Sequence, residues 1–174
     1  NLGNILRDLG KLKEAEISYR KAIKIKPDYA EVYSNLGITF KDLGNLEEAF
    51  DSYLKAIDIN PKNSNIYPLI TRFIIDSDPS QLNKSKLKYI LNLLLERNDV
   101  PHKELFMVFN FLYRNEIISS LEKLDSDFSN IDLLVNKKVI INALKKITFR
   151  DIRLEKVLTN VRKYLCNKIT NNKK

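Results

Sequence analysis

YSNLGITFKDLGNLEEAFDSYLKAIDINP, residues 33–61, has a second copy about 34 residues upstream in the same chain. Sliding the sequence by this period superposes six pairs of small, aromatic or turn-forming residues: Gly3 and Gly37, Gly10 and Gly44, Ala15 and Ala49, Tyr19 and Tyr53, Ala22 and Ala56, Pro27 and Pro61. A period of this length is typical of repeats that stack as pairs of helices. The sequence therefore predicts an all-α fold in which a two-helix unit occurs about twice.

The recurring positions resemble the tetratricopeptide repeat (TPR), a helix-turn-helix unit. That pattern sets a Leu-Gly pair and an aromatic residue on the first helix, an Ala-aromatic-Ala series on the second, and a proline after it. The second copy fills these positions with Tyr33, Leu36, Gly37, Phe40, Ala49, Tyr53, Ala56 and Pro61, and the first copy with Leu2, Gly3, Leu6, Ala15, Tyr19, Ala22 and Pro27. The resemblance covers about the first third of the chain and implies a TPR superhelix of about two repeats.

Apolar residues at three- and four-residue steps predict helices along the whole chain. In the repeats these are Leu12–Ile25, Ala30–Leu43 and Leu46–Ile59, followed by a capping helix over 64–76, where Thr71 replaces the glycine and the regular stack ends. Beyond the repeats we expect helices over Leu82–Arg97, Pro101–Asn115, Glu116–Asp125, Asn130–Ile147 and Asp151–Ile169, with capping boxes at Ser129 with Asp132 and at Thr148 with Asp151.

Two domains are predicted from the cap-forming side chains and the proline between Asp76 and Ser80. We assign residues 1–78 to the TPR repeats with their capping helix, and residues 79–174 to an α-helical C-terminal domain. Within the repeats, a glycine in a helix interior indicates that two backbones approach too closely for a Cβ atom. The pattern places Gly3 opposite Ala15 and Gly37 opposite Ala49.

The composition of the 174-residue chain, which is 44% hydrophobic, is sufficient for a folded core. No apolar run approaches the ~20 residues that a membrane span requires. The start of the sequence lacks a basic stretch followed by an apolar run, so no signal peptide is predicted. The single cysteine, Cys166, cannot form an internal disulfide, which favours a reducing, cytoplasmic location.

Catalysis is not predicted. No glycine follows Gly44, so residues 45–174 lack a glycine-rich loop for a phosphate or a methyl donor. His102 is the only histidine and has no orienting partner in the sequence, and Cys166 has no histidine nearby. We therefore expect neither an enzyme nor a metal or cofactor site.

Binding is the function that the resemblance implies. In TPR arrays the first helices of successive repeats line a concave groove, and the side chains that face it select a protein or peptide ligand. Matching positions in this chain are Asn1, Asn4, Arg7 and Asp8 from one helix, Glu31, Ser34, Asn35, Ile38, Lys41 and Asp42 from the next, and Asn65, Leu69 and Arg72 from the third. From these we select Asn1, Asn4, Arg7, Glu31, Asn35, Ile38, Lys41, Asn65 and Arg72 as the predicted peptide-binding residues.

Two binding modes of such arrays can be compared with this sequence. Asn1 and Asn35 are equivalent and resemble the asparagine ladder of the O-GlcNAc-transferase type, in which amides grip the backbone of an extended peptide; Leu69 ends the ladder. A clamp for a terminal carboxylate would use Asn4 and Asn35, but Asn65 and Leu69 stand where Lys and Arg are required. The alternative role of Asn35 is to bridge neighbouring repeats.

The rest of the chain allows two further readings. Residues 82–124 look like helical segments that follow TPR arrays in some bacterial proteins ending in a methyltransferase domain, which implies a non-catalytic part of a larger bacterial enzyme. Residues 1–63 carry ten Lys or Arg against ten Asp or Glu, whereas 133–174 carry twelve against two. This basic end could bind RNA through Lys137, Lys138, Lys145, Lys146, Arg150, Arg153, Lys156, Arg162 and Lys163.

Solvated helix faces explain those basic residues better, because Phe149 and Tyr164 are the only aromatics there that could stack on bases. Nucleic acid is therefore not the expected partner.

At the opposite end, the apolar face of the first helix lacks a preceding repeat in this sequence, and we expect this face to favour self-association. The face carries Leu2, Ile5, Leu6 and Leu9.

Overall fold

The computed structural model describes residues 2–122, 137–147, 155, 159, 162 and 163. Its helices are α1 (Leu2–Asp8), α2 (Leu12–Ile25), α3 (Ala30–Asp42), α4 (Leu46–Ile59), α5 (Ile66–Asp76), α6 (Lys84–Glu96), α7 (Phe106–Glu122) and α9 (Lys138–Lys146), with short 3-10 helices η1 (Pro79–Gln81) and η2 (His102–Leu105). No strand occurs in the described ranges. The predicted all-α class is confirmed, and α2, α3 and α4 lie within one residue of their expected bounds.

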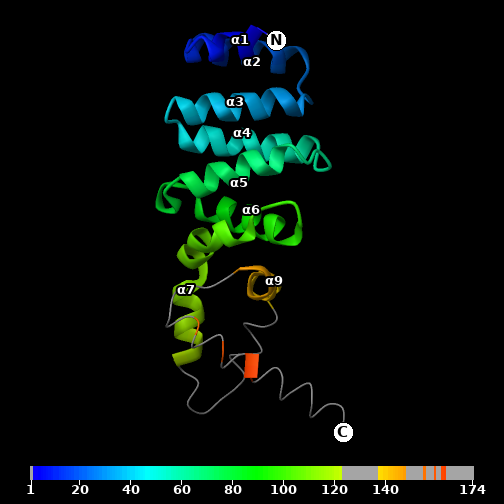
Figure 1. The fold of residues 1–174 in the computed structure, drawn as a ribbon. Helices are drawn as coiled ribbons and strands as arrows, with labels where there is room; N and C mark the ends of the chain where they lie inside the picture. Colours follow the sequence, from blue (N-terminus) through cyan, green and yellow to red (C-terminus); the bar gives the residue numbers. More distant parts are fainter. Residues whose placement is uncertain (1, 123–136, 148–154, 156–158, 160–161, 164–174) are drawn as a thin grey trace. The chain divides into compact units, whose positions relative to one another are not determined.

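Helices α1 to α5 stack in chain order, each packed against the next (Figure 1). In addition, α3 contacts α5, so the first helices of successive pairs lie beside one another. The buried face of each second helix carries the repeated small and aromatic residues: Ala15 and Tyr19 on α2, Ala49, Tyr53 and Ala56 on α4. The period seen in the sequence is therefore the period of the stack.

The turns inside the two repeats have the same geometry because glycine supplies a backbone conformation that other residues avoid. Gly10 has φ +74° and Gly44 has φ +77°. The Gly10 amide donates to the Arg7 carbonyl at 2.8 Å, and the Lys11 amide donates to the Leu6 carbonyl at 2.8 Å. This pair of bonds closes the helix end as a Schellman motif, and Gly44 repeats it one period later.

The helix-interior glycines make room for tyrosine rings. A Cβ atom built on Gly37 would lie 2.9 Å from Cε1 of Tyr53, and one on Gly3 would lie 2.5 Å from Cε1 of Tyr19. The three nearest atoms belong in both cases to the tyrosine, so its ring is what a side chain at either glycine would meet first. The expected pairing of each glycine with the alanine one turn before that tyrosine stays a prediction. An aromatic ring projects farther from its helix than a methyl group, and it therefore reaches the opposite backbone first.

Helix α5 closes the stack with an aromatic cluster. The ring of Phe73 lies 5.3 Å from that of Tyr53 and 5.7 Å from that of Phe50, centroid to centroid, and all three side chains are buried. Tyr67 donates its hydroxyl to the Pro61 carbonyl at 2.6 Å. After the helix ends, the Asp78 carboxylate accepts from the Ser80 amide at 2.9 Å, which is the cap expected from the sequence.

Two compact units divide the chain, and they are interleaved: residues 1–90 with 97–100, and residues 91–96 with 101–174. The first unit includes residues 79–90 because α4 binds the start of α6. Glu47 accepts from the Asn83 amide at 2.7 Å and from Lys86 Nζ at 3.1 Å. A domain boundary at residue 79 stays a prediction; the compact units place residues 79–90 with the repeats.

In the first unit, Lys86 also lies 2.5 Å from the Asp51 carboxylate, which raises the pKa of the lysine above its usual range. Arg97 bonds to Asp99 through two nitrogens, at 2.7 and 2.5 Å, and places its guanidinium 3.5 Å from the centre of the Tyr67 ring. The short segment 97–100 is thereby fixed on α5.

In the second unit α7 is one continuous helix over Phe106–Glu122, whereas the sequence predicts two helices that meet at residues 115 and 116. That division is wrong, because Asn115 and Glu116 form no stop signal and Ile117 continues the buried side of Val108, Phe109 and Leu112. Helix α9 covers residues 138–146 of the expected helix 130–147. The capping boxes at Ser129 and Thr148 and the ends of the helix expected over 151–169 lie outside the described residues.

Candidate functional site

The predicted binding residues of α3 share one side of that helix. Glu31, Asn35 and Ile38 follow one another at four- and three-residue steps, which places them above one another on the helix surface. Glu31 is exposed, and Asn35 and Ile38 are half-buried. The amide of Asn35 makes no side-chain hydrogen bond to another described residue. We call this surface, continued by Asn4 and Arg7 on α1, the first-helix face; Asn1 lies outside the described residues.

On α1 the predicted residues have internal partners. The Asn4 Oδ1 atom accepts from the Tyr19 hydroxyl at 2.6 Å, so the oxygen of this amide is already bound within its repeat. Arg7 is 21% exposed, and its Nη2 lies 3.5 Å from Asp8. Burial raises the pKa of Tyr19 above its usual value and the positive charge of Arg7 opposes that change. Burial also raises the pKa of Tyr53, assisted by Asp42, and Arg7 again opposes it.

Two of the three predicted cations, Lys41 and Arg72, are brought together by Asp76, the last residue of α5. Lys41 Nζ donates to Asp76 Oδ2 at 3.0 Å, and Arg72 Nε lies 2.9 Å from Asp76 Oδ1. The Lys41 hydrogen bond is the main reason that the pKa of Asp76 lies below its ordinary value, and the Arg72 bond adds to it. One carboxylate thus joins α3 to α5 and pairs with both cations.

Asp76→Asn should remove a pH-dependent part of the stability. Because its folded-state pKa is lowered, Asp76 stabilises the fold above its ordinary pKa of 3.8 and loses this contribution as the pH falls through the folded-state pKa. We expect the variant to be less stable than the parent chain at pH 7 and the difference to disappear in strong acid. Urea unfolding at several pH values measures this, and Asp58→Asn, an exposed carboxylate on α4, is the control. A difference that is constant with pH would contradict the assigned role.

Asn65 lies at the residue before α5, exposed, with its backbone amide bonded to Asn63 Oδ1 at 3.1 Å. No hydrogen bond or ion pair connects it to the other predicted residues in the part of the chain that the structure describes. Of the predicted set, therefore, α3 supplies a continuous surface, Lys41 and Arg72 meet through Asp76, and Asn65 stands apart.

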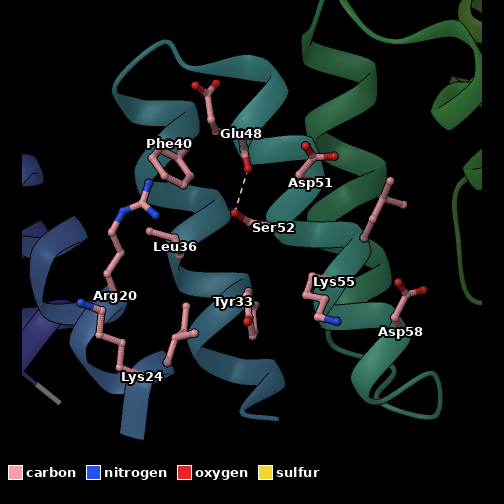
Figure 2. A pocket seen from close by; sticks show the side chains of 12 residues that line it. Arg20, Lys24, Tyr33, Leu36, Phe40, Glu48, Asp51, Ser52, Lys55 and Asp58 are labelled. Atoms are coloured by element: carbon pink, nitrogen blue, oxygen red, sulfur yellow. Dashed lines mark hydrogen bonds between the residues drawn. The ribbon is translucent and has the colours of Figure 1, made fainter. Parts of the chain in front are cut away.

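A cavity of the described first unit lies on the other side of α3. It has a volume of about 770 Å³, and Figure 2 shows its walls on α2 and α4 and its floor on α3. Its lining residues are Arg20, Ile23, Lys24, Tyr33, Leu36, Phe40, Glu48, Asp51, Ser52, Leu54, Lys55 and Asp58. We call it the α2–α4 groove. None of the predicted binding residues lines it, because Tyr33, Leu36 and Phe40 lie about half a helix turn away from Glu31 and Asn35.

The groove has an apolar floor between walls of different charge. Leu36 and Phe40 are almost fully buried beneath it. Arg20 places its guanidinium 5.4 Å from the centre of the Phe40 ring and bonds to Glu16 at 2.8 Å, which holds it at the groove edge. Ser52 turns its hydroxyl to the Glu48 carbonyl of its own helix at 2.7 Å and offers no donor to a ligand there. The surface can bind apolar groups at its base and charged groups at its rims.

Two family models match the stacked region. The model described as TPR repeat matches residues 3–44, and the model described as tetratricopeptide repeat matches residues 30–63. Residues 3–63 are tetratricopeptide repeats. Together the matched ranges cover the two helix pairs α1–α2 and α3–α4, so the TPR resemblance of this part of the sequence is confirmed. The O-GlcNAc-transferase and methyltransferase resemblances are not tested by these matches and stay predictions.

The crystal structure of MamA is similar to this chain with a TM-score of 0.51 over 95% of this chain and 97% of that one, at 20% identity. At this identity the similarity supports the helical fold alone. No curated protein matches the sequence. Tetratricopeptide repeats are units of protein-protein interaction, and the first unit of this chain therefore has the architecture of an interaction module.

Outside the TPR region the described residues present little chemistry of their own. His102 is half-buried and its Nε2 atom has no hydrogen-bond partner among them, while Cys166 falls outside the described ranges. No group of three or more metal-ligating side chains occurs in the parts of the chain that the structure covers. None of the helices in those parts has the length and apolar character that crossing a membrane requires.

Several basic residues of the second unit are paired with acids. Lys137 bonds to Glu116, Lys138 lies 2.6 Å from Glu96, and Arg162 lies 2.6 Å from Glu155. These pairs reduce the charge that Lys137, Lys138 and Arg162 can offer to phosphates. The expectation that nucleic acid is not the partner stays a prediction.

Proposed function

We propose that this chain is a non-catalytic protein-interaction module whose TPR region binds an extended peptide across the first-helix face. The observation that carries the proposal is Asn35. Its amide is half-buried on α3 and makes no side-chain hydrogen bond to another described residue, whereas the amide oxygen of Asn4, one repeat earlier, is bound by Tyr19. A free amide both donates and accepts, as the backbone of an extended peptide does.

The neighbours of Asn35 support a peptide ligand. Ile38 offers an apolar contact one turn along α3, and Glu31 offers a negative charge one turn in the other direction. Asp76 pairs with both Lys41 and Arg72, so these two cations are less available to a terminal carboxylate. The proposed ligand is therefore an internal segment of a partner, with a basic side chain near Glu31.

Asn35→Ala should weaken the binding of such segments by about tenfold, because a buried pair of hydrogen bonds to a peptide contributes on the order of 1–2 kcal/mol. A random peptide library displayed on phage, selected on the parent chain, supplies the ligands. Their affinities are then measured for Asn35→Ala and for Lys55→Ala, whose substitution lies in the α2–α4 groove. The proposal fails if the selected peptides bind Asn35→Ala as tightly as the parent chain.

Self-association through α1 also stays a prediction. Leu2, Ile5 and Leu9 are 63, 57 and 68% exposed. An apolar stripe of this kind favours association with another surface. We expect Ile5→Glu to reduce the average mass measured by sedimentation at high concentration, while Ile25→Glu, which changes an isolated exposed isoleucine, leaves it unaltered. A chain that sediments as a monomer at every concentration would exclude this role.

The cytoplasmic location predicted from the cysteine content is likewise part of the proposal.

A further inference from the structure

We propose that the α2–α4 groove is a second docking site, separate from the first-helix face, and that its ligand is an amphipathic helix of a partner protein. The apolar stripe of this helix would contact the groove floor. One flank of the stripe would be acidic and the other basic. The inference rests on the shape of the groove and on the charges of its two walls.

The shape suits a helix. The floor residues Tyr33, Leu36 and Phe40 follow one another along α3 at steps of three and four, which is the spacing of apolar anchors on a partner helix. The α4 wall runs from Glu48 to Asp58, a distance of about 15 Å at the rise of an α-helix. A partner helix of about three turns spans this length, and a volume of about 770 Å³ admits several of its apolar side chains.

The charges of the two walls identify the ligand. The α2 wall contributes Arg20, which is paired with Glu16, and Lys24, which has no ion-pair partner among the described residues. The α4 wall contributes Glu48, Asp51 and Asp58; Asp51 is paired with Lys86, whereas Glu48 and Asp58 have no ion-pair partner in the described part of the chain.

Lys55 lies on the α4 wall between two of these acids, so the wall keeps an acidic balance (Figure 2). A ligand whose charges all have the same sign would be attracted by one wall and repelled by the other. A helix with an acidic flank toward α2 and a basic flank toward α4 is attracted by both. This argument disfavours a phosphate-bearing ligand such as RNA or a lipid surface for the groove.

Three synthetic helical peptides with the same leucine stripe test the proposal. The first carries glutamate on one flank and lysine on the other, the second carries glutamate on both, and the third carries lysine on both. We expect the mixed peptide to bind at least about fivefold more tightly than the other two at low salt, with the difference narrowing as salt is added. Equal affinity of all three, or binding of none, would overturn the proposal.

A matched pair of variants locates the binding. Lys24→Glu makes both walls acidic, so the all-lysine peptide should become the tightest ligand. Lys21→Glu changes the charge of an exposed residue of the same helix that does not line the groove, and it should leave the order of the peptides unchanged. If the two variants behave alike, the peptides bind elsewhere and the assignment is wrong.

Leu54→Glu, at a half-buried position of the groove wall, should weaken all three peptides at least about tenfold, and circular dichroism with a melting curve verifies that the variant is folded. The parent chain alone is examined by sedimentation in parallel. A dimer that Leu54→Glu dissociates would show that a second copy fills the groove, and this result would replace the proposed ligand. Asn35→Ala should leave the peptide affinities unchanged, which separates this test from that of the first-helix face.

Discussion

Replacing Gly37 by leucine should lower the free energy of unfolding by about 3 kcal/mol, the upper part of the range for an overfilled core. The first atom of the new side chain would already lie 2.9 Å from the Tyr53 ring. That ring cannot retreat freely, because it is 2% exposed and packs on Phe73 at 5.3 Å. Urea denaturation with near-ultraviolet detection of the tyrosines measures the change, and an unaltered midpoint would show that α3 and α4 do not pack at Gly37.

A double-mutant cycle separates packing from backbone effects at this position. Combining Gly37→Ala with Tyr53→Leu should cost less than the sum of the single changes, since the smaller side chain relieves the contact. Gly44→Ala is the control, because its added methyl group meets no atom within 4 Å. Its cost, about 1 kcal/mol, comes from the positive φ of 77° and should not depend on Tyr53.

Phe73→Ala should destabilise the first unit by about 3–5 kcal/mol, the usual cost of removing a buried phenyl ring. Phe73 is fully buried and its ring contacts both Phe50 and Tyr53, so the change opens a cavity between α4 and α5. Calorimetry measures the loss, and hydrogen exchange should show faster exchange in α5 than in α2. Tyr89→Ala removes a ring that is 51% exposed and should cost less than about 1 kcal/mol. Similar losses for the two variants would contradict a central role for the cluster.

The repeated part of the fold could be predicted because its signals are local and occur twice. Gly10 and Gly44 end their helices through the same pair of hydrogen bonds, and the 34-residue spacing already placed them at equivalent turns. The bounds of α2, α3 and α4 followed for the same reason. In the second unit the sequence contains no repeat, and the helix boundary that it predicts at residues 115 and 116 does not occur, because the buried side of α7 continues across them.

The candidate sites were less predictable because they depend on which side chains meet across helices. Asp76 reads as a helix end in the sequence, and only the packing of α5 beside α3 brings it to Lys41, 35 residues away. The residue that lies nearest to Gly37 is Tyr53, because the tyrosine ring reaches across the contact between α3 and α4. The groove could not be predicted, because Leu36 and Phe40 fill the repeat pattern and give no separate sign of a surface; both side chains are buried, and their outer edges form the groove floor.

The interleaving of the two units determines how the chain can be dissected. A shortened chain that ends at residue 90 loses Arg97, and the Tyr67 ring loses the guanidinium stacked on it at 3.5 Å. A shortened chain that ends at residue 100 keeps that contact, but it contains Leu91, Leu94 and Leu95, which belong to the second unit. These three side chains are fully buried in the intact chain, and the shortened chain lacks the rest of the unit to which they belong. No single cut therefore releases either unit intact. A protease nick or a premature stop between residues 90 and 100 damages both units, and transplanting the whole first unit into another protein requires residues 97–100 to be supplied with it.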